Sequence, residues 1–245
     1  MSQLALGVAA DVSQRHISFI ETGRSRPSRE LVRHLGNVLD VPLREQNAML
    51  TAAGHAATHP ETDPDDLLGL LPALQFVVEA HTPYMAIVVD RRWNVVASNA
   101  PAQRLAGRLL DPNALGVNGA LNLMRAMFHP LGLRRFVSNW ESVWPALLAG
   151  LERDVAQAPR DDELARLLDE VRSLTSTERG SGAVDGGLLM SLRYEIGDTR
   201  FDLFTTIATI DAPLDVTVSE LRIETFWPAD ARSDRAWREF ISGSE

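Results

Sequence analysis

Apolar residues recur at intervals of three or four positions through the first 55 residues of the chain. This spacing places them on one face of a helix and leaves the polar residues on the opposite face. The intervening Gly, Pro and Asp residues are typical of tight turns between such helices. The pattern therefore predicts short helices at 2–9, 13–21, 28–39 and 42–53.

After a small, polar, proline-containing linker at 56–66, β-rich stretches appear. Two of them flank Asp90-Arg91-Arg92, which predicts a hairpin. Helix-like spacing follows, then a loop rich in Ser, Thr and Gly, then three more β-rich runs. The predicted helices are 66–80, 136–157, 161–174 and 230–241, the loop is 175–187, and the strands are 84–89, 93–98, 188–196, 200–210 and 216–226.

Two strands, a helical middle and three further strands are typical of an α+β domain with an antiparallel five-stranded sheet and covering helices. The runs 190–194 and 201–204 partly alternate between apolar and polar residues, which indicates one covered face and one wet or partly covered face. We therefore expect an all-α domain at 1–55, a linker at 56–66 and an α+β domain at 67–245.

Charge is spread unevenly along the chain, whose net charge is −9. Residues 1–55 carry six arginines against five acidic residues, whereas the remainder carries 18 arginines against 28 acidic residues. An acidic surface repels nucleic acid, so DNA binding would have to use the N-terminal part.

Several kinds of chemistry are excluded by composition. The chain has no cysteine, which removes disulfides and thiolate sites and fits a cytoplasmic location. It has no lysine, which excludes a P-loop nucleotide site and an enzyme that forms a Schiff base through lysine. We find no catalytic motif and expect no enzyme. His55 and His59 lack a third strong ligand, so we expect neither a metal site nor a required cofactor.

The segment 3–24 has the features of two helices joined by a tight turn. Gly7 is small enough to let the helices cross closely, and Ser13 is a good N-cap for the second helix. Gly23 is suited to end that helix in the left-handed conformation. From the first turns of the second helix, Gln14, Arg15 and Ser18 are predicted to point outward.

The stretch 12–27, VSQRHISFIETGRSRP, resembles the phage-repressor-like helix-turn-helix family, also called XRE or Cro-type, and the resemblance covers about residues 2–53. In that family the second helix enters the major groove of double-stranded DNA. The resemblance implies that Gln14 and Arg15 reach base edges, with Ser18 beside them. Phe19 would meet a thymine methyl group or pack inside, and the phosphates would be held by Gln3, Ser13 and Arg24.

Two positions depart from the family pattern. The family has a further helix before Gln3, so either the start codon is misassigned or the domain is shortened and exposes apolar surface. The turn position usually held by glycine is Asp11, which tolerates a left-handed conformation less well.

The larger domain has the element order of a PAS-like domain. Four stretches sharpen the likeness: 89–99 (VDRRWNVVASN), 122–130 (NLMRAMFHP), 139–141 (NWE) and 221–230 (LRIETFWPAD). Together they resemble the MmyB-like transcription regulators over about residues 70–230. The resemblance implies a ligand-binding domain behind the helix-turn-helix, with a fatty-acid-like ligand in some members.

Apolar and cationic residues in the helical middle suit such a ligand. Methionines and aromatic residues can line an adaptable apolar pocket, or simply form the core. Cationic residues nearby could hold a carboxylate, or form a solvated basic edge or an ion pair. An amide such as that of Asn139 could equally satisfy backbone groups at a structural corner. The candidate ligand residues are Met124, Arg125, Phe128, His129, Arg134, Asn139, Trp140 and Trp144.

The sequence thus predicts a ligand-responsive transcription regulator that binds DNA as a homodimer and senses an apolar, fatty-acid-like ligand. The alternative is a PAS-like dimerisation or partner-binding protein whose shortened N-terminus binds DNA weakly.

Overall fold

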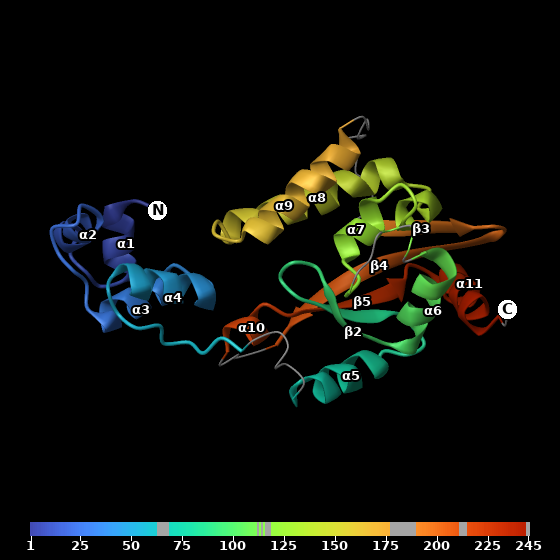
Figure 1. Ribbon diagram of the computed structural model, residues 1–245, viewed down its shortest axis with the longest axis horizontal. Coiled ribbons are helices and arrows are strands. Elements are labelled where there is room, and N and C mark those ends of the chain that lie inside the picture. The colour runs from blue at the N-terminus through green and yellow to red at the C-terminus, as the bar shows by residue number, and fades with distance from the viewer. Residues whose placement is uncertain are drawn as a thin grey trace. The chain divides into compact units, whose positions relative to one another are not determined.

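The computed structural model describes residues 1–62, 69–111, 113, 115, 119–176, 190–210 and 215–243. The chain divides into two compact units (Figure 1). The first comprises residues 1–63 and 212–219, and the second comprises residues 64–211 and 220–245. This division differs from the predicted domain limits because it assigns a short segment near residue 215 to the first unit.

The first unit begins with helices α1 (Gln3–Ala9), α2 (Gln14–Glu21), α3 (Arg29–Val38) and α4 (Leu43–Ala52). All are predicted correctly to within one residue at each end. The serines before α1, α2 and α3 have extended backbones, and each side chain accepts the amide N–H three residues ahead at 3.2 Å. These caps satisfy amide groups that the helix leaves unpaired, so the helix starts are fixed locally.

The crossing of α1 and α2 depends on Gly7. A Cβ atom at this position would lie 2.5 Å from the carbonyl oxygen of Val12, and the Val12 amide donates to the Gly7 carbonyl at 2.8 Å. Asp11, in the turn, has a φ of 50°. Leu4 and Val8, one turn apart on α1, are 59% and 77% exposed. The first unit therefore pairs a close helix crossing with an apolar face on α1 that is open to solvent.

A short helix from the far end of the chain completes the first unit. Helix α10 (Val216–Ser219) packs against α4, and its Val216 amide donates to the Pro60 carbonyl at 2.9 Å. The Asp215 carboxylate accepts hydrogen bonds from the Thr62 amide and hydroxyl, both at 2.9 Å. It also accepts the amides of Thr217 and Val218, as a helix cap does. The predicted strand 216–226 is therefore wrong over its first residues.

The second unit is built on a five-stranded sheet in the order β2-β1-β5-β4-β3. All neighbouring strands are antiparallel, which confirms the predicted α+β class. A two-residue turn with Gly197 at φ 59° joins β3 to β4, as tight hairpins favour. The strands are β1 (Ala86–Val89), β2 (Val95–Ser98), β3 (Ser191–Ile196), β4 (Thr199–Thr209) and β5 (Arg222–Pro228).

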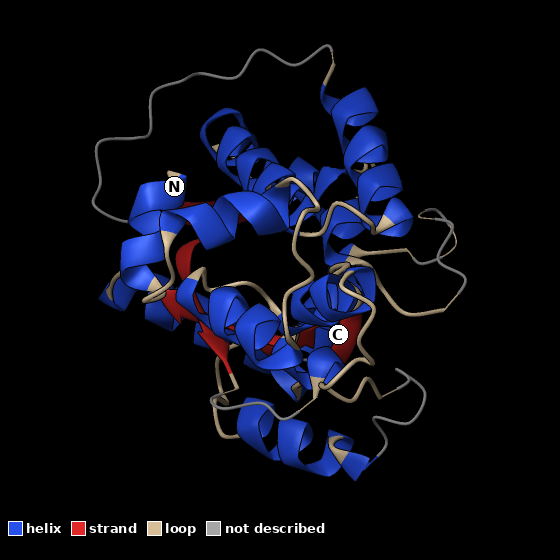
Figure 2. Cartoon of the chain, turned by 90° about the vertical axis from the view of Figure 1, so that its left-hand side faces the viewer, coloured by secondary structure: helices blue, strands red, loops and turns tan. Residues whose placement is uncertain are grey.

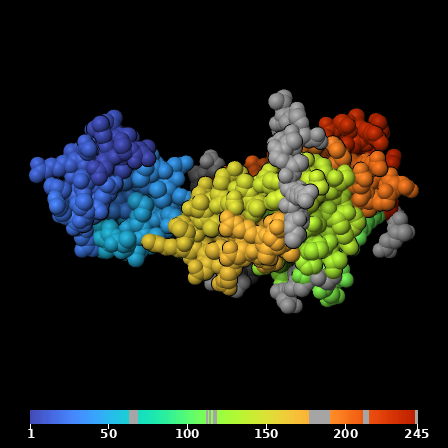
Figure 3. Space-filling model, turned by 90° about the horizontal axis from the view of Figure 1, so that it is seen from above, coloured from blue at the N-terminus to red at the C-terminus, as the bar shows by residue number. Residues whose placement is uncertain are grey.

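Helices lie on both faces of this sheet (Figures 1 and 2). Helix α5 (Leu71–Glu79) packs Leu74 and Val78 onto one face. The other face is covered by α6 (Ala100–Leu109), α7 (Leu123–Phe128), α8 (Trp140–Gln157) and α9 (Asp162–Thr175). Helices α8 and α9 form part of the outer surface seen in Figure 3. Helix α11 (Ala231–Ser242) packs on β4 through Trp237.

Asn99 ties α5, β1 and α6 together. Its side chain is fully buried, and its oxygen accepts the amides of Ala86 at 3.1 Å and Ala102 at 3.2 Å. Its nitrogen donates to the carbonyls of Val78 at 3.1 Å and Tyr84 at 2.8 Å. A buried amide with every group paired fixes the position of α6 beside the sheet.

Other predicted limits need correction. The helix predicted at 136–157 is split into a 3₁₀ turn, Leu133–Phe136, and α8, because Val137 pairs with Tyr194 of β3. The strand predicted from 93 begins at Val95, because Trp93 has a left-handed backbone with a φ of 67°. The strand predicted from 84 begins at Ala86, and the helix predicted from 66 is described from Leu71. Of the loop predicted at 175–187, the residues after Ser176 lie outside the described residues.

Among the described residues, no helix has both the length and the hydropathy needed to cross a bilayer.

Replacing Gly7 with alanine should lower the free energy of unfolding of the first unit by about 1–3 kcal/mol, because the added Cβ meets a backbone carbonyl. Urea denaturation followed by circular dichroism measures the change. Gly107→Ala in α6 is the control, since nothing lies within 4 Å of a Cβ there. The control should be neutral or stabilising by about 0.5–1 kcal/mol. An unchanged midpoint for Gly7→Ala would contradict the close crossing.

Candidate functional site

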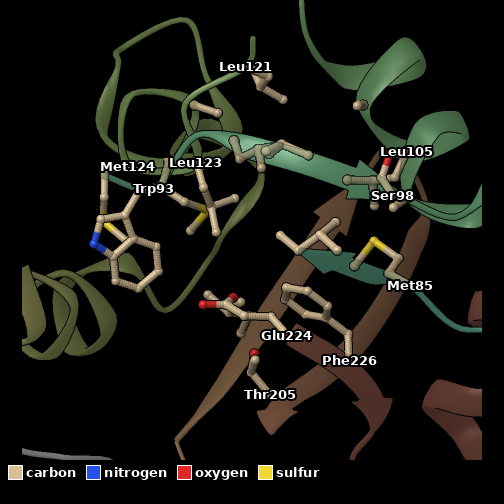
Figure 4. A pocket seen from close by; sticks show the side chains of 18 of the residues that line it. Met85, Trp93, Ser98, Leu105, Leu121, Leu123, Met124, Thr205, Glu224 and Phe226 are labelled. Atoms are coloured by element: carbon tan, nitrogen blue, oxygen red, sulfur yellow. The ribbon is translucent and has the colours of Figure 1, made fainter. Parts of the chain in front are cut away.

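A cavity of about 410 Å³ lies between the sheet and the helices that cover the face opposite α5, which we call the inner face. Its wall is mainly aliphatic, aromatic and methionine side chains, which suits an apolar ligand (Figure 4). The lining residues are Met85, Ile87, Trp93, Val95, Ser98, Ala102, Gln103, Leu105, Ala106, Leu110, Leu121, Leu123, Met124, Ala126, Met127, Leu133, Leu147, Met190, Leu192, Tyr194, Thr205, Ile207, Glu224 and Phe226.

The sheet contributes to this wall in a regular way. Alternate residues of a strand point to the same face, and Glu224 of β5 stands directly between Ile87 of β1 and Ile207 of β4. The opposite side chains of β5 and β1, such as Ile223 and Val88, pack under α5 instead. The strand register therefore decides which side chains face the cavity.

Glu224 is the acidic residue among the described residues of the wall. It is 5% exposed, and its side chain points from β5 into the cavity (Figure 4). Its carboxyl group makes no hydrogen bond to any residue that the structure describes. Burial raises the pKa of Glu224 to about 7; Arg222 opposes this rise and Asp154 adds to it. An unpaired carboxyl in an apolar wall favours its neutral form.

A charged cluster stands beside this carboxyl. Asp154 of α8 pairs with Arg222 of β5 at 3.0 Å and accepts a hydrogen bond from the Trp93 indole, also at 3.0 Å. The Arg222 guanidinium lies 4.2 Å from the centre of the Trp93 ring. These contacts hold Trp93 in its left-handed backbone conformation, where a bulky residue is otherwise unfavourable. They also direct Arg222 toward Asp154.

Of the ligand residues predicted from the sequence, Met124 lines the cavity. None of the three predicted cations does. Arg125 pairs with Glu170 at 2.9 Å, and its side chain is 48% exposed. His129 accepts the Leu131 amide at 3.2 Å. Arg134 donates to the Phe128 carbonyl at 3.3 Å and lies 5.6 Å from the Trp140 ring.

The predicted aromatic and amide residues belong to the core beside the cavity. Phe128 and Trp140 meet edge to face, with ring centres 5.1 Å apart. Asn139 donates to the Ser191 carbonyl at 2.8 Å and accepts the Arg193 amide at 2.9 Å, so it joins α8 to β3. Trp144 is half-buried, and its indole nitrogen has no partner among the described residues.

Sequence reasoning missed Glu224 and its neighbours Trp93 and Phe226 as lining residues. The available signal was the polar residue at 224 in an otherwise apolar β-rich run. Alternation alone could not tell which face of the strand would enclose space, because β5 is buried on both faces at Ile223 and Glu224.

The first unit presents the predicted DNA-contacting residues on and around α2. Gln14 and Arg15 are exposed on its first turn, and Ser18 and Phe19 are half-buried on the next. The Arg15 guanidinium lies 5.2 Å from the centre of the Phe19 ring. Ser13 is exposed and caps α2, and Arg24 is exposed after its end.

Gln3, by contrast, already has a partner within the unit. Its amide donates to the carboxylate of Glu21 at 2.6 Å, and this bond links the start of α1 to the end of α2. A phosphate contact by Gln3 would have to replace or share this bond.

His55 and His59 both form hydrogen bonds within the first unit. His55 is 2.9 Å from the Pro27 carbonyl, and His59 is 3.3 Å from the Gln46 amide oxygen. Within the described ranges, no three His, Asp or Glu side chains gather closely enough to hold a metal ion.

Comparison with protein families gives two matches. The model of the MmyB-like transcription regulator ligand binding domain matches residues 70–239. A helix-turn-helix model matches residues 1–46. No curated protein matches the chain.

Replacing Asp154 with alanine should lower the free energy of unfolding of the second unit by about 2–4 kcal/mol, because it leaves Arg222 and the Trp93 indole unpaired in a mostly buried place. Urea titration followed by tryptophan fluorescence measures this. Glu152→Ala on the same helix is the control, since its pair with Arg172 is about half exposed. The control should change stability by no more than about 0.5 kcal/mol, and equal losses in both variants would disprove a special role for Asp154.

Proposed function

Because this chain belongs to the family of MmyB-like transcription regulators, we propose that it is a ligand-responsive, sequence-specific DNA-binding regulator. The observation that carries this proposal is the presence, in one chain, of a helix-turn-helix with an exposed second helix and a unit that encloses an apolar cavity. We assign no catalytic reaction to it and place it in the cytoplasm with its DNA.

In this proposal α2 enters the major groove. Gln14 suits the edge of adenine and Arg15 suits that of guanine. The Phe19 ring supports the Arg15 guanidinium and orients it along the exposed face. Ser18 and Phe19 would contact the same groove, while Gln3, Ser13 and Arg24 would hold phosphates. The acidic remainder of the chain would stay away from the DNA backbone.

We further propose that two copies act together. A single helix-turn-helix reads few bases. The usual solution is a homodimer on a pseudo-palindromic site whose two half-sites are about one helical turn apart. The second unit, which we take to be PAS-like from its element order and five-stranded sheet, would supply the two-fold contact.

The ligand proposed for the cavity has a long apolar chain, as a fatty acid has. The wall supports this because aliphatic and methionine side chains from the sheet, α6 and α7 surround the space. No cation lines the described wall, so Arg125, His129 and Arg134 could serve a head group only at the margin of the cavity. Burial of the chain would then supply most of the affinity.

Arg15→Ala should weaken binding to the specific operator by about 1–3 kcal/mol and binding to random DNA much less, because it removes a base contact. Fluorescence anisotropy on an operator selected in vitro with the unaltered protein gives both values, and its stoichiometry should be two chains per site. Arg33→Ala, which removes the same charge from an exposed position on α3, is the control. Equal losses on both DNAs for Arg15→Ala would assign it to phosphate contact.

Affinity for straight-chain fatty acids should rise with each added methylene, by up to about 0.8 kcal/mol, until the cavity is filled. Thermal stabilisation of the protein by a series of chain lengths measures this. Ala106→Leu, which adds atoms at the wall, should shift the best ligand to a shorter chain. Arg104→Leu, on the exposed face of the same helix, should leave the series unchanged. A flat series would refute a chain-binding cavity.

A further inference from the structure

The described wall of the cavity carries one carboxylic acid, that of Glu224, and no basic side chain. Of the described lining residues, Glu224 and Tyr194 are ionisable, and Tyr194 is a buried phenol whose pKa burial raises well above its usual value. The remaining polar side chains in the wall are Ser98, Gln103 and Thr205. Glu224 is 95% removed from solvent and has no hydrogen-bond partner among the described residues, so a ligand group is the natural partner for its carboxyl.

We propose that Glu224 is the specificity-determining residue of the cavity, and that its protonated carboxyl donates a hydrogen bond to an uncharged acceptor at the end of an apolar chain. The preferred ligands are then esters or protonated acids rather than carboxylates or amines. This inference rests on the proposed apolar ligand and specifies its head group.

The charges around Glu224 support its neutral form. On its own strand, Arg222 faces the same side but is paired with Asp154 and stacked on Trp93. From α8, the Asp154 carboxylate faces the site as a like charge. Strands β1 and β4, which flank β5, and strand β2 beyond β1 contribute no charged side chain to the described wall. Burial is the largest cause of the raised pKa, so the proton is held near neutral pH.

An amine head group fits this site less well. An ion pair buried in an apolar wall is stable only if further hydrogen bonds satisfy both charged groups. The described wall offers few such groups near Glu224, and the carboxyl itself makes none. An ionised fatty acid fits no better, because no cation in the described wall would pair with it. An uncharged carbonyl needs one donor, which the protonated carboxyl supplies.

Three probes of equal chain length separate these cases: methyl dodecanoate, dodecanoate and dodecylamine, titrated into the full-length protein by calorimetry. Since Glu224 must be protonated and its pKa is about 7, affinity for the ester should fall about tenfold between about pH 6 and about pH 8. The ester has no ionisable group, so this fall reports on the protein alone. At either pH the ester should bind more tightly than the amine and the carboxylate.

Glu224→Gln keeps a hydrogen-bond donor but cannot ionise, so its affinity for the ester should be the same at both pH values. Glu195→Gln removes an acid from β3 outside the cavity, where Glu195 pairs with Arg200 at 3.5 Å, and should retain the tenfold fall. If Glu224→Gln does not fold, the infrared carbonyl band of the protonated Glu224 in the unaltered protein should shift when the ester binds.

Two results would overturn this inference alone. One is an ester affinity that does not change with pH in the unaltered protein, and the other is tightest binding by the amine, increasing as pH rises. Failure of all three probes to bind would overturn the apolar-ligand proposal as well. The two failures are therefore distinguishable in the same titrations.

Discussion

The two-sided burial of β5 is the constraint on which the second unit depends. This strand is central in the sheet and is buried on both faces at Ile223 and Glu224, although Trp227 near its end is 39% exposed. Its register with β1 and β4 places Ile223 under α5 and Glu224 toward the inner helices. A slip of one residue would exchange the two faces and bring an apolar residue into the place of the acid. The chemistry of the cavity is thus set by strand register.

The Glu224 carboxyl has no hydrogen-bond partner in the described part of the chain, and the arginine on its own strand is engaged elsewhere. Arg222 lies two residues from Glu224 on the same strand, but its guanidinium is held by the Asp154 carboxylate and the Trp93 ring. The same contacts stabilise the left-handed backbone of Trp93, which turns its ring into the wall. The cluster of Asp154, Arg222 and Trp93 therefore both supports the cavity wall and keeps Arg222 from pairing with Glu224. A substitution of Asp154 would affect both.

Local signals made much of the fold predictable. The helices of the first unit follow from apolar spacing and serine caps, and the close crossing follows from Gly7. What could not be predicted depends on partners far apart in the sequence. Helix α10 forms where Asp215 meets Thr62, and the break before α8 forms where Asn139 meets β3. We predicted from its neighbours in the sequence that Arg125 holds a fatty-acid carboxylate, whereas in the structure Arg125 pairs with Glu170.

The position of α10 has a consequence for how such a protein can evolve. The chain leaves the first unit, builds most of the second, returns to add α10 and leaves again. A recombination event with a single junction near residue 64 would join the ligand-binding unit to a foreign DNA-binding domain that lacks Pro60 and Thr62, the partners of Val216 and Asp215. The two units are thus expected to be inherited as a pair, with substitutions at 60–62 and 215–217 accepted together.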